Sequence, residues 1–272
     1  RQMNADRPVT VQDLAAMRDR GEPIVMVTAY DANAAGLADA AGIPVLLVGD
    51  SLGMVVLGHD TTIPVTLDDM IHHAGAVVRG TGRALVVVDL PFGSTQGGPA
   101  DALHSAVRVL KETGAAAVKL EGGRRAAETV RTLVEAGIPV MGHVGLTPQS
   151  VHAFGGYRVQ GRGDGAVEAL EADVAALGEA GAFAIVLEAV PTVVGRSVAA
   201  ASSVPVIGIG AGPDVHGQVL VWHDLLGLGE GPHPRFVKAY DDLRGRTIAA
   251  LRAFASEVRD GTYPGPEHGY GA

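Results

Sequence analysis

The segment Val45-Leu46-Leu47-Val48-Gly49-Asp50-Ser51 decides the fold, because its pattern recurs along the chain: a short apolar run that ends on a carboxylate. The same pattern is found in Val86-Val87-Val88-Asp89, Val118-Lys119-Leu120-Glu121 and Ile185-Val186-Leu187-Glu188. Each run is too short for a helix and is flanked by Gly or Pro, which is typical of a buried strand. A charge at the end of a buried strand must reach solvent or meet a partner. We therefore interpret the four acids as parts of one site.

Length and composition indicate one α/β domain. A chain of 272 residues is normal for a single (β/α)8 barrel, and no Ser/Pro/Gly-rich linker or charge run divides it. Residues are 47% hydrophobic but only 4% aromatic, so the core is expected to consist of Ala, Val, Leu and Ile, as in many α/β enzymes. We expect residues 1–272 to form one barrel domain with an N-terminal helix and a C-terminal helical tail.

Charge and cysteine content exclude several classes of function. A net charge of −9 argues against a nucleic-acid partner, which needs a basic face. The absence of cysteine excludes disulfides, thiolate metal sites and a cysteine nucleophile. Residues 1–7 lack an apolar signal core, and the longest uncharged stretch, Ser197 to Pro213, is too short and too polar for a membrane span. The sequence therefore predicts a soluble, cytoplasmic protein.

Eight short strands alternate with helical segments. Strands are predicted at residues 24–28, 45–48, 84–89, 116–120, 139–143, 184–187, 204–209 and 218–222. Helices are predicted from residue 10 and at 34–41, 67–79, 99–113, 124–136, 165–180 and 190–201, and the tail over 234–260 is predicted to be a helix or a pair of helices. Alternating strands and helices imply parallel pairing with right-handed crossovers, and eight such units close into a barrel. A doubly wound open sheet is the competing fold.

Polar residues at the strand ends indicate a cation site, because the carboxyl ends of barrel strands gather around one mouth. In chain order, these residues are Asp31, Asp50 with Ser51, Asp89, Lys119 with Glu121, His143, Glu188 and Asp224. Oxygen ligands favour a hard cation such as Mg²⁺, Mn²⁺ or Ca²⁺. Mg²⁺ takes about six oxygens, so two carboxylates would leave roughly four positions for a chelating substrate and water.

The sequence around each acid indicates whether it belongs to the site. Asp31 and Asp224 are interpreted as helix caps or solvated loop residues. Asp50 and Asp89 end successive strands and precede long glycine-bearing loops, which favours a role in the site. Glu188 has no basic residue near it in sequence before Arg196, so desolvation is expected to raise its pKa, which suits a general base.

Two basic residues lie within the predicted strands. Lys119 stands inside an apolar strand, so it either extends to the surface or points into the mouth, and we favour a partnered functional lysine. His143, at a strand end, is the one histidine that we retain as a weaker candidate. The glycines of Gly208 to Gly212 resemble a dinucleotide fingerprint only superficially, since Pro213 and Asp214 break the spacing.

Longer motifs extend through nearly the whole chain. They are Thr28–Asp31, Val48–Met54, Gly58–Thr66, Asp89–Phe92, Val118–Gly123, Gly142–Ser150, Phe154–Tyr157, Val159–Gly163, Leu187–Glu188, Pro205–Gly212, Tyr263–Pro264 and Glu267–His268. In these segments, and in their order, the chain closely resembles the ketopantoate hydroxymethyltransferase family.

The resemblance implies a (β/α)8 TIM barrel of the phosphoenolpyruvate/pyruvate superfamily. It implies transfer of a hydroxymethyl group from 5,10-methylenetetrahydrofolate to 3-methyl-2-oxobutanoate, giving 2-dehydropantoate, with one Mg²⁺ per subunit of a homodecamer. It assigns the metal to Asp50, Asp89 and Glu121, keto-acid binding to Asp50, Ser51, Asp89 and Lys119, and proton abstraction to Glu188.

Thr95, His216 and Gly269 depart from the family pattern, which leaves the finer contacts to folate or between subunits open.

Two alternative functions remain beside the hydroxymethyltransferase interpretation. A carbon–carbon lyase of the same superfamily would carry a cysteine in its catalytic loop, and this chain has none. A non-catalytic keto-acid-binding barrel would retain Asp50 and Asp89 but would have no need of Glu188.

Overall fold

The computed structural model describes residues 7–231 and 233–271. The chain divides into two compact units, residues 1–221 and 222–272, and each is described by itself.

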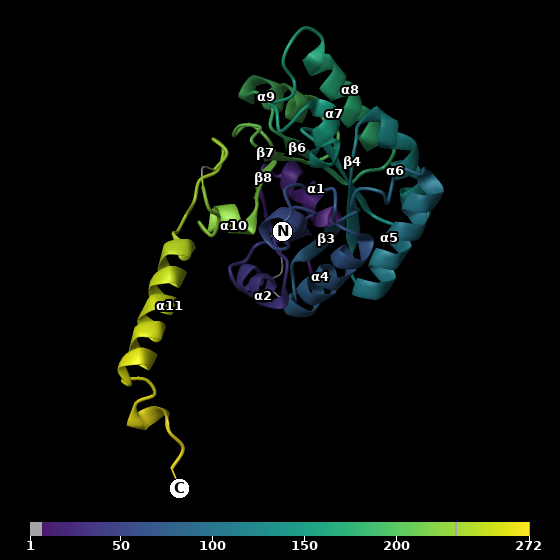
Figure 1. Ribbon diagram of the computed structural model, residues 1–272. Helices are drawn as coiled ribbons and strands as arrows, with labels where there is room; N and C mark the ends of the chain where they lie inside the picture. Colours follow the sequence, from purple (N-terminus) through teal and green to yellow (C-terminus); the bar gives the residue numbers. More distant parts are fainter. Residues whose placement is uncertain (1–6, 232, 272) are drawn as a thin grey trace. The chain divides into compact units, whose positions relative to one another are not determined.

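The first unit is a closed barrel of eight parallel strands (Figure 1). The strands are β1 Ile24–Thr28, β2 Val45–Val48, β3 Leu85–Asp89, β4 Ala117–Glu121, β5 Val140–Gly145, β6 Ala184–Glu188, β7 Val206–Ile209 and β8 Gly217–Leu220. Each strand pairs with the next, and β8 pairs with β1 to close the ring. The predicted barrel is thus confirmed, with strand ends within two residues of the expected ones, and the open doubly wound sheet is excluded.

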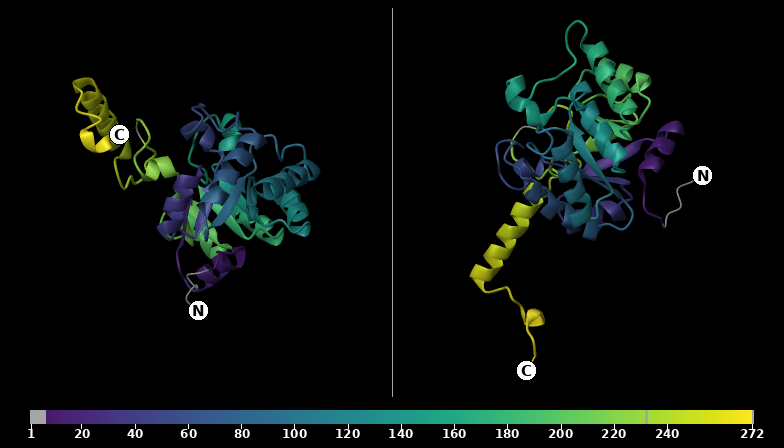
Figure 2. Two further views of the ribbon diagram at one scale, coloured as in Figure 1. Left: turned by 90° about the horizontal axis from the view of Figure 1, so that it is seen from below. Right: turned by 90° about the vertical axis from the view of Figure 1, so that its right-hand side faces the viewer.

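Helices surround the strands (Figures 1 and 2). The longer ones in this unit are α1 Val11–Asp19, α2 Ala32–Ala40, α4 Leu67–Gly80, α5 Pro99–Thr113, α6 Ala127–Glu135, α8 Ala166–Glu179 and α9 Thr192–Ala201. Short helices lie in the loops after β2, β4 and β5: α3 Leu52–Val55, η1 Arg124–Ala126, η2 Pro148–Ser150 and α7 Val151–Phe154.

Side-chain caps fix where two of these helices begin. Asp31 caps α2, since its Oδ1 accepts a hydrogen bond from the backbone N–H of Ala34 at 2.7 Å. Thr66 and Asp69 form a reciprocal capping box at the start of α4. The interpretation of Asp31 as a helix cap is therefore confirmed, and this carboxylate is separate from the site described below.

Alternate strand residues fill the barrel. Leu85 and Val87 of β3, like Ala184 and Val186 of β6, belong to the buried apolar core. At one end of the barrel this core continues into Val9, Leu14 and Met17, so α1 and the segment before it close that end. Because side chains alternate with a period of two, the next inward positions on β3 and β6 are Asp89 and Glu188. The alternation along the strands thus places these two acids inside the barrel at its carboxyl end.

The second unit contains α10 Trp222–Leu225, α11 Leu243–Asp260 and η3 Pro266–His268. The tail over 234–260, predicted to be a helix or a pair of helices, contains one helix that begins only at Leu243, because the side chain of Asp242 caps it by accepting from the backbone N–H of Gly245 at 2.8 Å. Asp224 lies in α10, with its Oδ1 3.4 Å from Nδ1 of His233. None of the helices in the described part of the chain is long and apolar enough to cross a membrane.

Candidate active site

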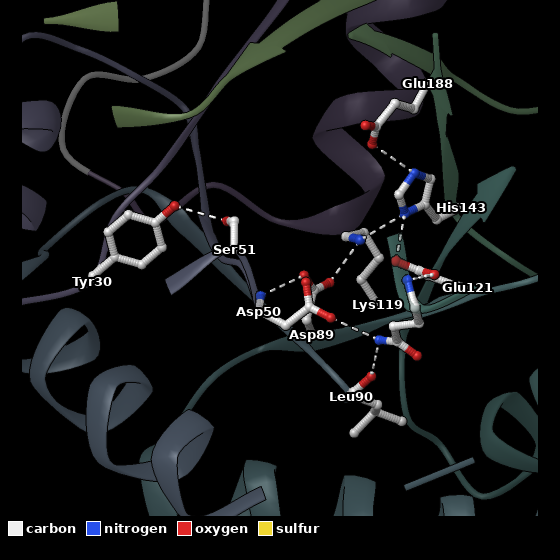
Figure 3. A network of polar contacts seen from close by, with 10 residues as sticks. Tyr30, Asp50, Ser51, Asp89, Leu90, Lys119, Glu121, His143 and Glu188 are labelled. Carbon is white, nitrogen blue, oxygen red and sulfur yellow. Dashed lines mark hydrogen bonds and ion pairs between the residues drawn. The ribbon is translucent and has the colours of Figure 1, made fainter. Parts of the chain in front are cut away.

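Five ionisable residues of four neighbouring strands meet inside the carboxyl end of the barrel (Figure 3). They are Asp89 of β3, Lys119 and Glu121 of β4, His143 of β5 and Glu188 of β6. Strand register sets their order, since Asp89 pairs with Lys119 and Glu121 pairs with His143. Asp89, Lys119 and His143 are each at most 4% exposed, so water screens their charges poorly.

Asp50 and Ser51 join the group from the end of β2. The backbone N–H of Asp50 donates to Asp89 Oδ2 at 3.0 Å, which places the two predicted metal ligands side by side. The side-chain amide of Gln149 donates to Asp50 Oδ2 at 2.9 Å. The hydroxyls of Ser51 and Tyr30 are hydrogen bonded at 2.8 Å. The structure thus brings together all of the residues that the sequence assigned to the site.

Lys119 is the cationic centre of the cluster. Its Nζ lies 2.8 Å from Asp89 Oδ1 and 3.1 Å from Nδ1 of His143. Burial on its own disfavours the ammonium, but the negative charges of Asp89, Glu121 and Asp50 outweigh burial and raise the pKa of Lys119. The side chain is only 4% exposed, so it points into the mouth instead of extending to solvent.

His143 is a neutral imidazole whose tautomer follows from its neighbours. Burial and the neighbouring Lys119 charge hold the pKa of His143 well below its ordinary value. An ammonium can only donate, so Nδ1 accepts from Lys119 and the ring proton resides on Nε2. Nε2 lies 3.1 Å from Glu188 Oε2 but makes no hydrogen bond within the described part of the chain. The histidine therefore lies directly against one oxygen of Glu188.

Glu188 has the proton affinity of a base that works near neutrality. Burial raises the pKa of Glu188 to about 7, and the positive charge of Lys119 opposes this only in part. A general base is most effective when its pKa lies near the working pH. The sequence-based expectation of a pKa raised by desolvation agrees with the structure.

The pair Asp50 and Asp89 fits a hard divalent cation. Burial, and then the charge of Asp89, raise the pKa of Asp50 to about 7, so two carboxylates oppose one another in a poorly screened site. A dication would offset this repulsion. Within residues 7–231 and 233–271, no three His, Asp or Glu side chains are grouped closely enough to hold a metal by themselves. Mg²⁺ is commonly held by one or two carboxylates, with substrate and water completing its coordination.

Glu121 faces the other side of this cluster. Its Oε2 accepts from the backbone N–H of Gln149 at 3.0 Å, and its Oε1 lies 3.5 Å from Nδ1 of His143. Burial, and then the charge of Asp50, hold the pKa of Glu121 well above its usual range. These contacts connect Glu121 with Gln149 and with His143.

A cavity of about 530 Å³ opens beside the cluster. It lies between the loop after β3 and the start of α6, and its lining includes Phe92, Thr95, Glu121, Arg125, Glu128 and Gln149. Glu121 and Gln149 belong both to the cavity wall and to the polar network. The cavity therefore adjoins the carboxylates of the network.

Sequence reasoning assigned no role to Gln149 or Tyr30, although both stand in the quoted motifs. Neither shows a periodic signal, because Gln149 lies in a polar loop and Tyr30 directly follows β1. Gly145 likewise received no role. It adopts φ +88°, and a Cβ there would lie 2.3 Å from the carbonyl oxygen of Glu188, so only glycine fits this approach of β5 to β6.

The three departures from the family pattern lie outside the polar network. Thr95 lines the cavity. Nδ1 of His216 accepts a hydrogen bond from the backbone N–H of Val206 at 3.0 Å, which joins the ends of β7 and β8. Gly269 lies in the second unit. The departures therefore leave the contacts among the acids, Lys119 and His143 unchanged.

A closed parallel barrel with acids and one lysine at its carboxyl mouth defines a class of TIM-barrel enzyme. The fold is similar to that of 2,3-dimethylmalate lyase, a PEP mutase/isocitrate lyase superfamily member, with a TM-score of 0.60, 19% identity, and coverage of 94% of this chain and 89% of that one. It is also similar to phosphonopyruvate hydrolase solved with oxalate and Mg²⁺, with a TM-score of 0.61, 16% identity, and coverage of 97% and 92%.

Residues 8–266 match the family model for ketopantoate hydroxymethyltransferase. The chain is 58% identical over 262 residues to the 3-methyl-2-oxobutanoate hydroxymethyltransferase of Moorella thermoacetica, an alignment that covers 96% of this chain and 97% of that one. The chain belongs to the ketopantoate hydroxymethyltransferase family and is thus an enzyme, a transferase of hydroxymethyl groups.

Glu188→Gln tests the environment of the proposed base through stability. The folded pKa of about 7 lies above the ordinary 4.5, so the contribution of Glu188 to stability is complete below pH 4.5 and is lost as the pH rises through 7. The amide in the variant stays neutral throughout. We expect the stability of the variant relative to the natural chain to increase by roughly 2–3 kcal/mol between pH 5 and pH 8, measured by urea unfolding.

Glu179→Gln is the matched control, because Glu179 is an exposed carboxylate at the end of α8. Its relative stability should hardly change over the same interval. A Glu188→Gln chain whose relative stability is the same at both pH values would show that Glu188 is not an acid of raised pKa.

Proposed function

We propose that the chain transfers a hydroxymethyl group from 5,10-methylenetetrahydrofolate to 3-methyl-2-oxobutanoate, giving 2-dehydropantoate and tetrahydrofolate. The observation that supports it most directly is Glu188, a buried carboxylate of pKa about 7 that shares the barrel mouth with cationic Lys119. This combination suits removal of a proton beside a carbonyl group. Membership of the family, whose relatives are named for this keto acid, supports the same substrate.

Glu188 is the proposed proton acceptor. The C3–H of the keto acid is adjacent to its carbonyl, so loss of the proton gives an enolate. Because the neutral form of Glu188 is favoured by burial, the carboxylate gains a proton readily. Its Oε2 lies 3.1 Å from Nε2 of His143, so Oε1 is the oxygen that we assign to the substrate.

Lys119 and Ser51 are the proposed binding groups for the keto acid. The ammonium of Lys119 is fixed by Asp89 and His143, so it offers a preorganised positive charge to the oxygen on which the enolate charge develops. The Ser51 hydroxyl, paired with Tyr30, offers a hydrogen bond at the end of β2.

Asp50 and Asp89 are the proposed ligands of a divalent cation, with Glu121 in support. Bound there, Mg²⁺ would draw charge from the keto oxygen and make the neighbouring C–H more acidic. Phosphonopyruvate hydrolase, which shares the barrel fold, was solved with oxalate and Mg²⁺, so a barrel of this type accommodates a small dicarboxylate together with this cation.

The overall reaction balances with one water. The enolate carbon forms a bond to the one-carbon unit, and the two C–N bonds that held this unit to the folate break. The two folate nitrogens gain two protons, one that derives from C3 and one from water. The water oxygen becomes the new hydroxyl group.

The cavity beside the network is the proposed site of the folate. Its volume of about 530 Å³ suits a bulky ligand, and Glu121 and Gln149 connect it with the carboxylates. Phe92, 44% exposed, offers an aromatic face to a flat heterocycle, and Arg125 offers positive charge to the anionic tail of the folate. The one-carbon unit would then lie next to the enolate.

A turnover assay tests the proposed reaction. Purified chain is mixed with 3-methyl-2-oxobutanoate, 5,10-methylenetetrahydrofolate and Mg²⁺, and each component is omitted in turn. We expect 2-dehydropantoate, followed by mass spectrometry, only in the complete mixture. Without folate, the C3 proton should still exchange with solvent D₂O, because enolisation precedes addition. No product in the complete mixture would contradict the proposal.

Glu188→Gln tests the role of the base. The amide cannot take a proton at neutral pH, so we expect C3 exchange in D₂O, followed by NMR, to fall by about 10²- to 10⁴-fold. Binding of the keto acid in the presence of Mg²⁺ should stay within about threefold, since Gln keeps the shape and the contact with His143. Exchange at the natural rate would remove Glu188 as the base.

Glu128→Trp tests the folate cavity. Glu128 is exposed on the first turn of α6 and lines the cavity, so a tryptophan there should fill its rim. We expect the KM for 5,10-methylenetetrahydrofolate to rise about tenfold or more, with C3 exchange in the absence of folate unchanged. Glu135→Trp, at the exposed far end of α6, is the control. An unchanged folate KM in Glu128→Trp would place the donor elsewhere.

A further inference from the structure

Gln149 makes three polar contacts at the mouth of the barrel. Its side-chain Nε2 donates to Asp50 Oδ2 at 2.9 Å and to the carbonyl oxygen of Leu90 at 3.0 Å. Its backbone N–H donates to Glu121 Oε2 at 3.0 Å. The residue lies in η2, in the loop after β5, and is 7% exposed. A buried glutamine that uses both amide protons is fixed in one conformation.

The two side-chain contacts require an amide nitrogen. Asp50 Oδ2 and the Leu90 carbonyl are both acceptors, so the group between them must donate twice. A methionine or leucine would leave both acceptors without a donor, and a glutamate would oppose them with a third oxygen. An asparagine is one methylene shorter and cannot reach as far. Glutamine is therefore the side chain that fits this position.

The amide also links parts of the barrel that are not neighbours. Asp50 follows β2 and Leu90 follows β3, whereas Gln149 follows β5, and β4 lies between β3 and β5. Across the described part of the chain, no hydrogen bond or ion pair reaches the other carboxylate oxygen of Asp50, Oδ1. The amide thus holds Asp50 by one oxygen and leaves the other for a ligand.

We propose that Gln149 is a positioning residue that holds the carboxylate of Asp50 in the orientation needed to bind a divalent cation. The inference rests on the proposed function, in which Asp50 and Asp89 hold that cation. The proposed role belongs to the side chain of Gln149 alone. The bond from the backbone N–H of Gln149 to Glu121 remains in any substituted chain, so the effect of the amide on Asp50 can be measured separately.

Mn²⁺ binding to the metal-free chain, followed by electron paramagnetic resonance without substrate, tests the inference. We expect Gln149→Met, which keeps the length of the side chain and removes its donors, to bind Mn²⁺ about 10- to 100-fold more weakly. Gln160→Met is the matched control, because among the described residues the Gln160 amide donates only to the carbonyl of Arg158, in the same long loop. The control should bind Mn²⁺ like the natural chain.

Gln149→Asn serves as a second variant that keeps a polar group in the site. It should bind Mn²⁺ at least threefold more weakly, because the shorter side chain cannot reach both acceptors. Thermal unfolding of each metal-free variant shows whether it is folded. Equal Mn²⁺ affinity of the natural chain and of both folded Gln149 variants would overturn the inference and leave the proposed function standing. A natural chain that binds no Mn²⁺ would instead contradict the proposed cation site itself.

Excess Mg²⁺ distinguishes a Gln149 that only positions Asp50 from a Gln149 that takes part in the reaction. If Gln149 acts only through Asp50, saturating Mg²⁺ should restore C3 exchange in Gln149→Met to within about threefold of the natural rate, and it should not restore Glu188→Gln. Exchange that stays low in Gln149→Met at saturating Mg²⁺ would show that the amide has a part in the reaction itself, and the inference would be wrong.

Discussion

The buried ion pair between Lys119 and Asp89 is the interaction on which the site depends. Lys119 Nζ lies 2.8 Å from Asp89 Oδ1, and both side chains are almost fully buried. Each charge therefore needs the other to offset the cost of its burial. Lys119 is the cation that lies beside Asp50, Asp89, Glu121 and Glu188. Without it, four acids would share a poorly screened interior with no positive charge beside them.

The same lysine sets the tautomer of His143, the residue that lies beside the proposed base. Because the ammonium can only donate, it imposes on the imidazole the tautomer that carries its proton on Nε2, the nitrogen that lies 3.1 Å from Glu188 Oε2. A protonated imidazole is disfavoured by burial and by the adjacent positive charge. One strand position, Lys119, therefore contacts Asp89 on one side and, on the other, sets the tautomer of the histidine beside Glu188.

The barrel and most of the site could be predicted from sequence, because both follow from the period of two in buried strands. Leu85, Val87 and Asp89 share one face of β3, so the pattern that fills the core also places the acid in the mouth. Gln149 could not be found in this way. Its role depends on the conformation of a loop and on acceptors that are distant in sequence, and neither leaves a periodic signal.

Two acids of the site, Asp50 and Glu188, have pKa values raised to about 7, but for different reasons. Burial alone raises that of Glu188, whereas Asp50 is opposed in addition by the charge of Asp89. Under the proposed function, a dication next to Asp50 and Asp89 would offset the second cause. It would leave the burial of Glu188 as it is. The two carboxylates would then differ in proton affinity, so that Asp50 stays ionised as a ligand while Glu188 remains free to take a proton.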